Sequence, residues 1–364
     1  MTVAMTGGGG FLGWHTRAYL HSIGERDVKS FSVGEAFELD IAASAVSGAE
    51  KLILLAGINR GTDDEVLEGN ITFGEQTASV LRSVPSPPKL VVFANSSQAG
   101  NGSIYGRAKE QSSEIIRLAA EEIGARFVDL RLPNLFGEHG RPFYNSVTAT
   151  FCHLLSRGEV PTVEVDRKLS LLHAQLAAEA LVEGRSTTDL AAGVHESTVS
   201  GLLTTLSRFA SAYERGDVPA LSSDFERDLF NTYRAFAFEV SPRLPLTQNT
   251  DDRGSFTEVI RSHGGEGQTS FSTTAPGVTR GQHYHRRKME RFTVLAGSGE
   301  IRLRRLFSDE VVTVTVDGSS PTSVDMPTFW AHSITNNGDE ILYTMFWSNE
   351  IFDPASPDTI PEIV

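Results

Sequence analysis

The chain has 364 residues, 40% of them hydrophobic and 21% charged, which is typical of soluble globular proteins and long enough for two domains. Its 32 basic and 46 acidic residues give a net charge of −14. This charge argues against a broad surface for nucleic acids or anionic membranes, although glycine loops and a few arginines can still hold a phosphate locally.

A single cysteine, Cys152, excludes an intrachain disulfide, and its apolar neighbours predict that it is buried in a helix. The start of the chain lacks the basic and long apolar segments of a secretory signal. No apolar run reaches the roughly 18 residues that a membrane span needs. We therefore expect a cytoplasmic enzyme without nucleic-acid or membrane partners.

The first 240 residues alternate short apolar runs with helical patterns. Strands that alternate with helices predict a parallel sheet covered on both faces, an α/β Rossmann-like domain. The predicted strands end in small or polar residues and lie in residues 2–6, 29–33, 51–57, 89–97 and 126–134.

A glycine run follows the first predicted strand. Gly7, Gly10 and Gly13 form one nucleotide-loop spacing, and Gly8, Gly10 and Gly13 form another. Both spacings place a tight turn before a helix that starts near Phe11, where a pyrophosphate can approach the backbone and the helix N-terminus. The alternative is a flexible glycine run without a ligand.

Tyr105 and Lys109 are four residues apart and share one face of the next predicted helix, downstream of Ser96 at a strand end. These motifs resemble the extended short-chain dehydrogenase/reductase family and favour the Gly7 spacing. The resemblance implies that Tyr105 is the acid, that Lys109 lowers its pKa and holds the nicotinamide ribose, and that Ser96, or Ser97, binds the substrate carbonyl. It also implies that Asn134 faces the substrate. The expected cofactor contacts are Gly7, Gly10, Phe11, Leu12, Gly13, Leu55, Ala56, Gly57, Tyr105 and Lys109.

The sequence departs from that family in two places. Ser96 and Tyr105 are only nine residues apart, which predicts a shortened loop over the site. The second strand does not end in an acidic residue for an NAD ribose, and Glu35 comes too late to replace it. We therefore expect NADPH, with NAD as the alternative; Arg17 and Lys29 are candidate phosphate partners.

After residue 240 the pattern changes. Residues 241–249 contain two prolines and predict a linker, and residues 250–364 show short alternating strands separated by Gly, Asn and Asp turns. This pattern predicts an all-β domain, a small barrel or jelly roll.

Two histidines in this domain are spaced for a shared site. His283 and His285 point the same way on a strand, and a hairpin can return Glu290 to the same pocket. With Gly277 and Gly297, these spacings reproduce the first motif of the cupin family. The second motif is represented by Pro327, His332 and Asn336, with Phe329 where a glycine is usual. Three imidazoles and a carboxylate suit Zn²⁺ or a similar divalent metal. The expected ligands are His283, His285, Glu290 and His332.

A metal-free alternative remains open. Residues 251–258 and 279–284 resemble sugar-nucleotide 3,5-epimerases, which are also cupin-shaped. In those enzymes the histidine at the position of His283 removes a proton without metal. Both alternatives place proton removal next to a ketone, and we expect Arg280 to face the substrate.

Over nearly its whole length the chain resembles the bifunctional capsular polysaccharide synthesis enzymes of the CapF family. The matching segments are residues 55–60, 131–137, 143–152, 251–258 and 349–359. The resemblance implies that the cupin epimerises C3 of a UDP-4-keto-6-deoxy-N-acetylhexosamine. The reductase then reduces C4 with NADPH, giving UDP-2-acetamido-2,6-dideoxy-L-talose for L-FucNAc synthesis. Tyr144 and Asn145 are candidate substrate contacts or helix-start packing residues. His173, Ala174 and Gln175 stand where the family usually has Val-Asp-Asp.

Two other functions stay open at this stage. One is a single-activity 4-ketoreductase whose cupin only binds the sugar nucleotide or builds the dimer. The other is a binding protein that senses redox state through NADPH without turnover. In each case we expect a homo-oligomer, most simply a homodimer.

Overall fold

A computed structural model describes residues 1–252 and 254–364. Packing divides the chain into two compact units. Unit 1 contains Met1–Leu135 and Leu169–Ser197, and unit 2 contains Phe136–Lys168 and Thr198–Val364. These units differ from the predicted domains 1–240 and 250–364, because segments of the first 240 residues pack with the C-terminal strands. The predicted boundary between sequence domains remains a prediction.

Unit 1 is built on a five-stranded parallel sheet in the order β2-β1-β3-β4-β5. The predicted α/β Rossmann-like class is confirmed. In sheets of this kind, ligands bind beyond the carboxyl ends of the strands where the strand order reverses, here between β1 and β3. The strands are β1 (Val3–Thr6), β2 (Val28–Phe31), β3 (Lys51–Leu54), β4 (Leu90–Ser96) and β5 (Arg126–Leu132).

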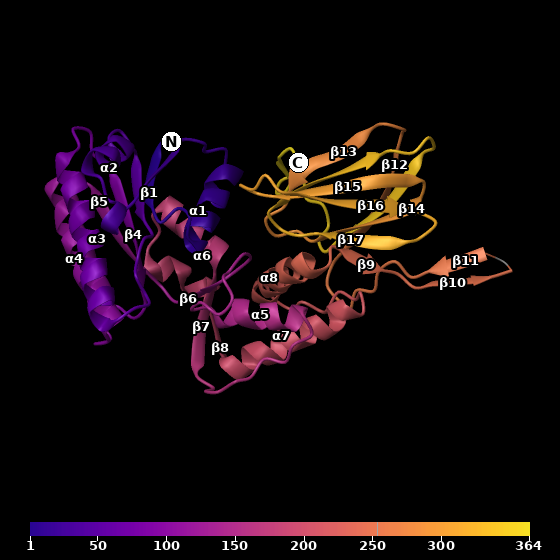
Figure 1. The fold of residues 1–364 in the computed structure, drawn as a ribbon, viewed down its shortest axis with the longest axis horizontal. Coiled ribbons are helices and arrows are strands. Elements are labelled where there is room, and N and C mark those ends of the chain that lie inside the picture. Colours follow the sequence, from indigo (N-terminus) through magenta and orange to yellow (C-terminus); the bar gives the residue numbers. More distant parts are fainter. Residues whose placement is uncertain (253) are drawn as a thin grey trace. The chain divides into compact units, whose positions relative to one another are not determined.

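Helices cover both faces of this sheet (Figure 1). One apolar core joins the sheet to α2, α3 and α4, and a second core joins its other face to α1 and α6. The described ranges contain no helix with the length and apolar character of a membrane span. The helices are α1 (Phe11–Ser22), α2 (Leu39–Val46), α3 (Asp63–Ser83), α4 (Ile104–Glu122) and α6 (Ala174–Glu183), with short 3₁₀ turns η1 (Gly34–Ala36) and η2 (Thr187–Gly193).

A three-stranded sheet, in the order β6-β7-β8, is formed by segments that cross between the two units along the chain. Its strands are β6 (Asn134–Phe136), β7 (Lys168–His173) and β8 (His195–Thr198). Unit 2 then contains α5 (Val147–Ser156), α7 (Val199–Glu214) and α8 (Asp224–Val240). Cys152 lies in α5 and is fully buried, as predicted, and burial raises the pKa of its thiol.

The C-terminal part of unit 2 is two antiparallel five-stranded sheets that enclose an apolar core, which confirms the predicted cupin class. Their orders are β12-β19-β14-β17-β9 and β16-β15-β18-β13-β20. The strands are β9 (Arg243–Pro245), β12 (Gln268–Thr274), β13 (Thr279–Tyr284), β14 (Glu290–Ala296), β15 (Ser298–Arg305), β16 (Val311–Asp317), β17 (Thr322–Met326), β18 (Trp330–Asn336), β19 (Leu342–Ser348) and β20 (Ile360–Pro361).

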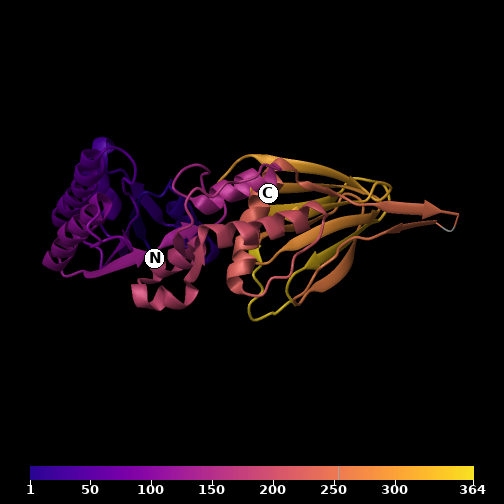
Figure 2. The ribbon, with the colours of Figure 1, turned by 90° about the horizontal axis from the view of Figure 1, so that it is seen from below.

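The predicted linker is integrated into unit 2, as is the helix α8 that precedes it. In residues 241–249, β9 pairs with β17, and β10 (Gln248–Asp251) forms a hairpin with β11 (Gly254–Thr257), which projects from the unit (Figure 2). Phe238 of α8 belongs to the cupin core, and its ring lies 4.9 Å from that of Trp330. The helix therefore closes one part of the cupin core.

A buried ion network fixes the helices of unit 2 to the cupin sheet. Asp325 binds Arg291 at 2.6 Å and Arg234 at 3.1 Å, and it accepts a 3.0 Å hydrogen bond from Tyr213. Burial alone would raise the pKa of Asp325, but the two guanidinium groups outweigh it and lower the pKa to about 2. The carboxylate is therefore ionised at neutral pH.

Replacing Asp325 with asparagine is expected to lower the free energy of unfolding of unit 2 by about 3–5 kcal/mol, because two buried guanidinium groups lose their counter-charge. The measurement is urea unfolding followed by tryptophan fluorescence. The wild-type contribution should be complete above pH 3.8 and be lost as the pH falls through about 2. Glu300→Gln is the control: Glu300 pairs with Arg302 at the surface, 3.9 Å away, so its loss should cost about 1 kcal/mol or less. Equal effects of the two changes would contradict the network's role.

Two candidate active sites

The glycine loop after β1 makes a close approach that only glycine permits. Gly7 has a φ of +68°, and a side chain there would lie 2.8 Å from the backbone nitrogen of Ala56. A side chain at Gly13 would lie 2.1 Å from the carbonyl oxygen of Gly7. The loop thus turns into α1 with its backbone uncovered, the arrangement that binds a pyrophosphate.

A cavity of about 520 Å³ lies beside this loop in unit 1. Leu55, Ala56 and Gly57, predicted cofactor contacts, line it together with Gly7 and Gly10. Phe11, Leu12 and Gly13 form the first turn of α1 instead of the cavity wall. Gly8, a member of the alternative glycine spacing, also lines the cavity. The remaining lining residues were not predicted: Gly9, Ser30, Phe31, Ser32, Val33, Ile58 and Phe73.

Two buried polar side chains that the sequence interpretation missed shape this cavity. The Thr6 hydroxyl accepts hydrogen bonds from the backbone of Leu55 and Ala56, at 3.2 and 3.3 Å. Asn70 of α3 bonds both the nitrogen and the carbonyl oxygen of Ile58, at 3.2 and 2.7 Å. The available signal was an asparagine in the interior of what the structure shows to be a helix, because such a residue is unfavourable there without a specific bond.

Replacing Gly13 with alanine is expected to weaken NADPH binding by at least about tenfold, because the new methyl group displaces the loop. The measurement is isothermal titration of the full chain with NADPH. Gly9→Ala is the matched control, since nothing lies within 4 Å of a side chain at that position. Equal binding by both variants would contradict a nucleotide site at this loop.

The second element of the site is the start of α4. Ser103 caps the helix by accepting a 3.0 Å hydrogen bond from the nitrogen of Gly106, which places Tyr105 in the first turn and Lys109 one turn later. The Nζ of Lys109 donates to the carbonyl oxygen of Ala94 at 2.8 Å and lies 3.9 Å from the ring centre of Phe93. Because Ser96 ends β4, the expected residues all lie at the carboxyl edge of the sheet.

Burial changes the acidity of both side chains. It raises the pKa of Tyr105, which is opposite to the lowering by Lys109 that the resemblance implied, so the phenol is protonated at neutral pH. It lowers the pKa of Lys109 to about 7, against a smaller opposing effect of Asp129. A protonated phenol beside an easily titrated amine suits proton donation to a developing alkoxide.

The substrate residues predicted for the reductase lie in different units. Asn134 begins β6 in unit 1, and its side-chain nitrogen donates to the carbonyl oxygen of Ser170 at 3.2 Å. Tyr144 and Asn145 precede α5 in unit 2 and are exposed. The guanidinium of Arg141 lies 5.0 Å from the ring centre of Tyr144. Their contact with substrate stays a prediction.

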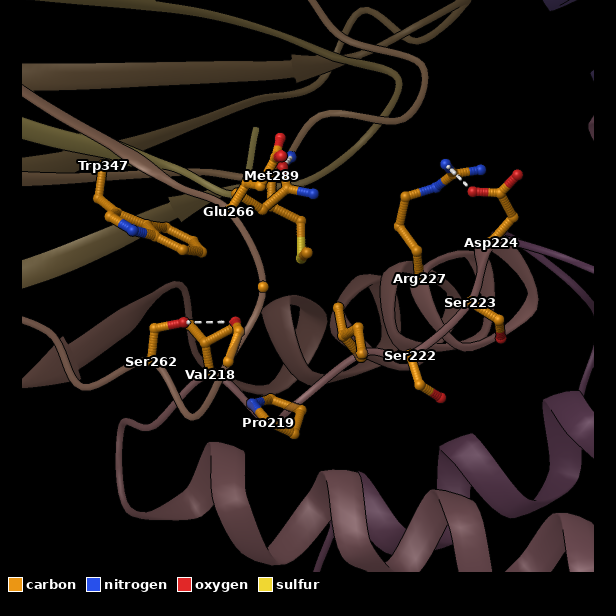
Figure 3. Close-up of a pocket in the computed structure, with 14 residues that line it drawn as sticks. Val218, Pro219, Ser222, Ser223, Asp224, Arg227, Ser262, Glu266, Met289 and Trp347 are labelled. Carbon is orange, nitrogen blue, oxygen red and sulfur yellow. Dashed lines mark hydrogen bonds and ion pairs between the residues drawn. The ribbon is translucent and has the colours of Figure 1, made fainter. Parts of the chain in front are cut away.

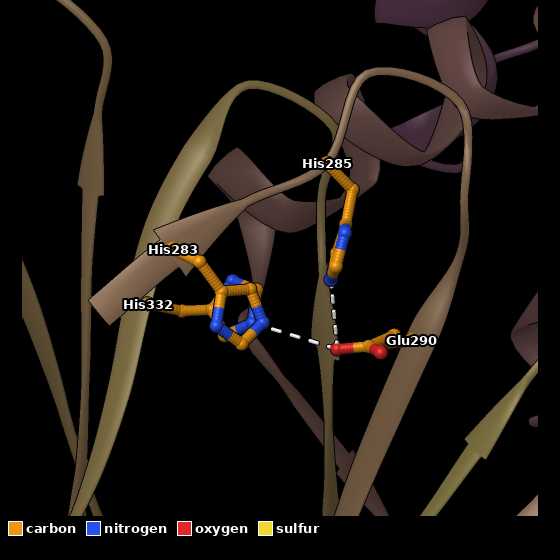
Figure 4. Close-up of side chains that lie close together, drawn as sticks. All are labelled: His283, His285, Glu290 and His332. Carbon is orange, nitrogen blue, oxygen red and sulfur yellow. Dashed lines mark ion pairs between the residues drawn. The ribbon is translucent and has the colours of Figure 1, made fainter. Parts of the chain in front are cut away.

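The four predicted metal ligands converge inside the cupin (Figure 4). His283 lies one residue before the end of β13, opposite His332 of β18. His285 follows this strand, and Glu290 begins β14. One ligand atom from each lies within 4.8 Å of the others. The rings of His283 and His332 are 4.6 Å apart. The group is compact enough for a single ion.

The hydrogen bonds of two imidazoles leave their inner nitrogens as acceptors. The Nδ1 of His285 lies 2.6 Å from the carbonyl oxygen of Asp358, and the Nδ1 of His332 lies 3.1 Å from that of Trp330. A nitrogen that faces a carbonyl carries the proton, so each Nε2 keeps its lone pair. Both Nε2 atoms are buried and make no hydrogen bond to the described residues.

The carboxylate completes the electrostatics of this group. Oε2 of Glu290 lies 2.9 Å from Nε2 of His285, and two acceptors so close are favourable only when a cation or proton lies between them. Burial would raise the pKa of Glu290, but contacts with the imidazoles outweigh it and lower the pKa well below its usual range. Burial, aided by neighbouring imidazoles, lowers the pKa of His283 to about 3. Neutral imidazoles at His283 and His332, whose pKa values burial lowers, and an ionised carboxylate fit a divalent cation.

Lys288 was not predicted from the sequence. It is buried, and its Nζ lies 2.9 Å from Oε1 of Glu290. One carboxylate oxygen therefore faces the ammonium group and the other faces the imidazoles. The only signal was a lysine two residues before the motif glutamate.

Comparison with known proteins identifies the family of the chain. Residues 249–360 match the family model described as the polysaccharide biosynthesis C-terminal domain. The UDP-2-acetamido-2,6-beta-L-arabino-hexul-4-ose reductase of Pseudomonas aeruginosa is 30% identical, over 99% of this chain and 98% of that protein. The crystal structure of capsular polysaccharide assembling protein CapF from Staphylococcus aureus is 34% identical, with full coverage of both chains and a TM-score of 0.63. The chain belongs to the CapF family. A structure of CapF with the inhibitor 3-isopropenyl-tropolone is 31% identical, with full coverage and a TM-score of 0.55.

In the second cupin motif of this CapF-family chain, the backbone accommodates Phe329 in place of the usual glycine. Phe329, in the glycine position, has a φ of +65°, a conformation that favours glycine. The residue is buried, and its nitrogen donates to the carbonyl oxygen of His285 at 2.8 Å. The side-chain nitrogen of Asn336 donates to the backbone carbonyl oxygens of Thr274 and Glu340, so this residue supports the fold.

Arg280 lies on the ligand-bearing face of its sheet. It pairs with Ile334, which shares a face of β18 with His332, and it is exposed. This position is compatible with the expected substrate contact. Arg253, in the 251–258 segment that resembles the epimerases, lies outside the described residues.

Unit 2 of the CapF-family chain has a further cavity of about 290 Å³ (Figure 3). Trp347, Met289 and Arg227 line it, and Arg227 pairs with Asp224 at 2.7 Å. Trp347 pairs with Arg291 across the sheet, so their side chains share one face. Glu290 precedes Arg291, and successive side chains of a strand point to opposite faces, so this cavity is on the other face of the sheet from the histidine cluster. It is not part of the cluster.

Proposed function

We propose that the chain carries two reactions on one sugar nucleotide. The cupin epimerises C3 of a UDP-4-keto-6-deoxy-N-acetylhexosamine, and the nucleotide-binding half reduces the C4 ketone with NADPH. The product is UDP-2-acetamido-2,6-dideoxy-L-talose, a precursor for capsular or surface polysaccharide. The observation that carries the proposal is a compact group of three histidines and a glutamate in a chain related end to end to a sugar-nucleotide 4-ulose reductase.

In the reductase half, the cofactor supplies a hydride to C4 when it is bound. Tyr105, protonated because burial raises its pKa, gives its proton to the oxygen that becomes the C4 hydroxyl. Lys109, whose Nζ donates to the carbonyl oxygen of Ala94, supplies positive charge when protonated and holds the nicotinamide ribose. Ser96 hydrogen-bonds the ketone. The glycine loop binds the pyrophosphate.

In the cupin half, the C3 hydrogen is acidic because the resulting carbanion delocalises into the C4 ketone as an enolate. His283, His285, Glu290 and His332 would hold Zn²⁺ or a similar ion, and such an ion would polarise the ketone and stabilise the enolate charge. A base takes the proton from one face of C3, and a proton from solvent returns to the other face. These steps conserve atoms and need no oxidant.

A metal-free mechanism for the same epimerisation has one supporting observation. His285 and His332 are anchored through Nδ1 to backbone carbonyls, whereas His283 makes no such bond to a described residue. Its imidazole is also neutral, as a base must be. In that mechanism His283 removes the C3 proton directly. Metal content distinguishes the two mechanisms.

Removing metal is expected to stop C3 exchange while leaving C4 reduction intact. After treatment with a chelator and gel filtration, the enzyme should exchange the C3 proton at least about 100-fold more slowly, and added Zn²⁺ should restore the rate. NADPH oxidation with already epimerised substrate is the internal control, because the described residues form such a ligand group only in the cupin. Full exchange by protein with less than one-tenth equivalent of metal would instead support His283 as a metal-free base.

The proposed function as a whole is tested by incubating the protein with the 4-keto-6-deoxy UDP-sugar and NADPH carrying deuterium at the transferable position. We expect stoichiometric NADPH oxidation and an L-talo product with deuterium at C4, identified by NMR. A product reduced at C4 but unchanged at C3 would support the single-activity reductase with a binding cupin. Absence of NADPH oxidation would contradict both enzymatic functions.

A further inference from the structure

The C-terminal tail of unit 2 returns to the strand that carries the metal-site histidines. β20 pairs with β13, so that Pro361 lies opposite His283 and Ile360 lies opposite Tyr284. Nearer the end, the nitrogen of Glu362 donates to the carbonyl oxygen of Gln282 at 3.0 Å. The tail therefore forms the edge of the sheet beside the cluster.

One tail residue, Asp358, binds the loop between the two ligand-bearing strands. Its Oδ1 accepts a 3.1 Å hydrogen bond from the nitrogen of Arg286, and its Oδ2 accepts bonds of 2.8 Å from those of Arg287 and Lys288. Three successive backbone donors thus converge on a single carboxylate. This loop joins His285 to Glu290.

The backbone of Asp358 makes a fourth contact. Its carbonyl oxygen lies 2.6 Å from Nδ1 of His285. The φ of Asp358 is +42°, a left-handed conformation that aspartate tolerates better than most residues. In this conformation the side chain and the carbonyl group engage the same loop.

The contacts reach two of the four proposed ligands by separate routes. The carbonyl of Asp358 fixes the tautomer and ring orientation of His285. The carboxylate fixes the backbone of Lys288, whose Nζ lies 2.9 Å from Oε1 of Glu290. Groups that orient metal ligands in this way typically change metal affinity by about 10- to 100-fold.

We propose that Asp358 is a positioning residue for the cupin metal site. It holds His285 and the Lys288–Glu290 pair in the arrangement that receives the ion, although it lies 73 residues from His285 in sequence. The inference rests on the proposed metal function of the cluster. It extends that function by making the C-terminal tail part of the site.

The test compares Asp358→Gly, Asp358→Asn and the control Asp353→Gly. Glycine removes the carboxylate while accepting the positive φ, and asparagine retains one side-chain oxygen. Asp353 belongs to the same exposed tail, and its carboxylate accepts a local hydrogen bond from the nitrogen of Ala355 at 2.9 Å. Each full-length protein is stripped of metal before measurement.

Three measurements apply to each variant: Zn²⁺ affinity by competition with a chromophoric chelator, the visible spectrum of the Co²⁺-loaded protein, and deuterium exchange of the amides of residues 286–288 without metal. Asp358→Gly should weaken Zn²⁺ binding about 10- to 100-fold, change the Co²⁺ spectrum and accelerate amide exchange. Asp358→Asn should be intermediate, and Asp353→Gly should match wild type. NADPH oxidation with epimerised substrate should be unchanged in all three.

Two negative outcomes have different meanings. If wild type binds Zn²⁺ and Asp358→Gly binds it within about twofold of the same affinity, the positioning role is overturned while the metal site stands. If wild type binds no stoichiometric divalent metal, the metal function fails and the inference fails with it. Retained NADPH oxidation shows in either case that the reductase half of the variant is folded.

Discussion

Replacing Tyr105 with phenylalanine is expected to lower kcat for NADPH oxidation by about 100- to 10,000-fold, the range of a lost general acid. The phenol is the group whose pKa burial raises, so it carries the proton that the alkoxide needs at neutral pH. Phenylalanine keeps the ring and removes only the hydroxyl. The measurement is the steady-state loss of NADPH absorbance with the 4-keto-6-deoxy UDP-sugar.

The control separates this effect from general damage. Tyr343→Phe changes a half-exposed tyrosine of β19 that belongs to neither site, and it should oxidise NADPH at the wild-type rate. NADPH affinity of the Tyr105 variant should stay within about threefold of wild type. Activity within tenfold of wild type would exclude Tyr105 as the proton donor.

Replacing His283 with alanine is expected to reduce epimerisation at C3 by at least about 100-fold. The change removes either one of four proposed ligands or the base of a metal-free mechanism, so both mechanisms predict the loss. The measurement is the rate at which the C3 proton of the 4-keto sugar disappears from the NMR spectrum in D₂O.

The variant should leave C4 reduction of already epimerised substrate intact, because the reductase residues lie in a different part of the chain. His195→Ala, an exposed histidine of β8, is the matched control and should epimerise normally. If His283→Ala also abolished reduction of that substrate, the assignment of the two reactions to separate sites would be wrong.

Local patterns in the sequence were sufficient for the two folds and for the ligand group. Alternating strands and helices predicted the parallel sheet, because such a pattern has few other solutions. The spacing of His283, His285 and Glu290 predicted that they converge, because strand geometry and a short hairpin leave little freedom. Gly7 and Gly13 were recognisable because their backbone positions exclude any side chain.

Features that depend on long-range packing were not predicted. The sequence pattern of α8 does not show that the helix is buried all round from Asp228 to Phe238, or that Phe238 enters the cupin core. The proline-containing linker includes β9 because a neighbouring edge strand, β17, is available for pairing. Asp358 resembled any turn aspartate, since its three backbone partners are about 70 residues away in sequence.

Polar residues that position other site residues were also missed, because their contacts depend on long-range packing. Thr6 and Asn70 bind backbone atoms, chiefly in the segment after β3, so neither forms part of a recognisable motif. Lys288 becomes informative only when its contact with Glu290 is seen. Motif spacing reveals groups that act on a ligand, but it does not reveal their supports.

The central claim is that the cupin cluster activates a sugar C–H bond without help from the reductase site. The most direct measurement supplies wild-type protein with the UDP-4-keto-6-deoxy-N-acetylhexosamine in D₂O, without NADPH, and follows C3 by NMR. The account predicts catalytic replacement of the C3 proton by deuterium with the C4 ketone intact. A C3 proton that persists at the uncatalysed rate, while the same preparation oxidises NADPH, would contradict it.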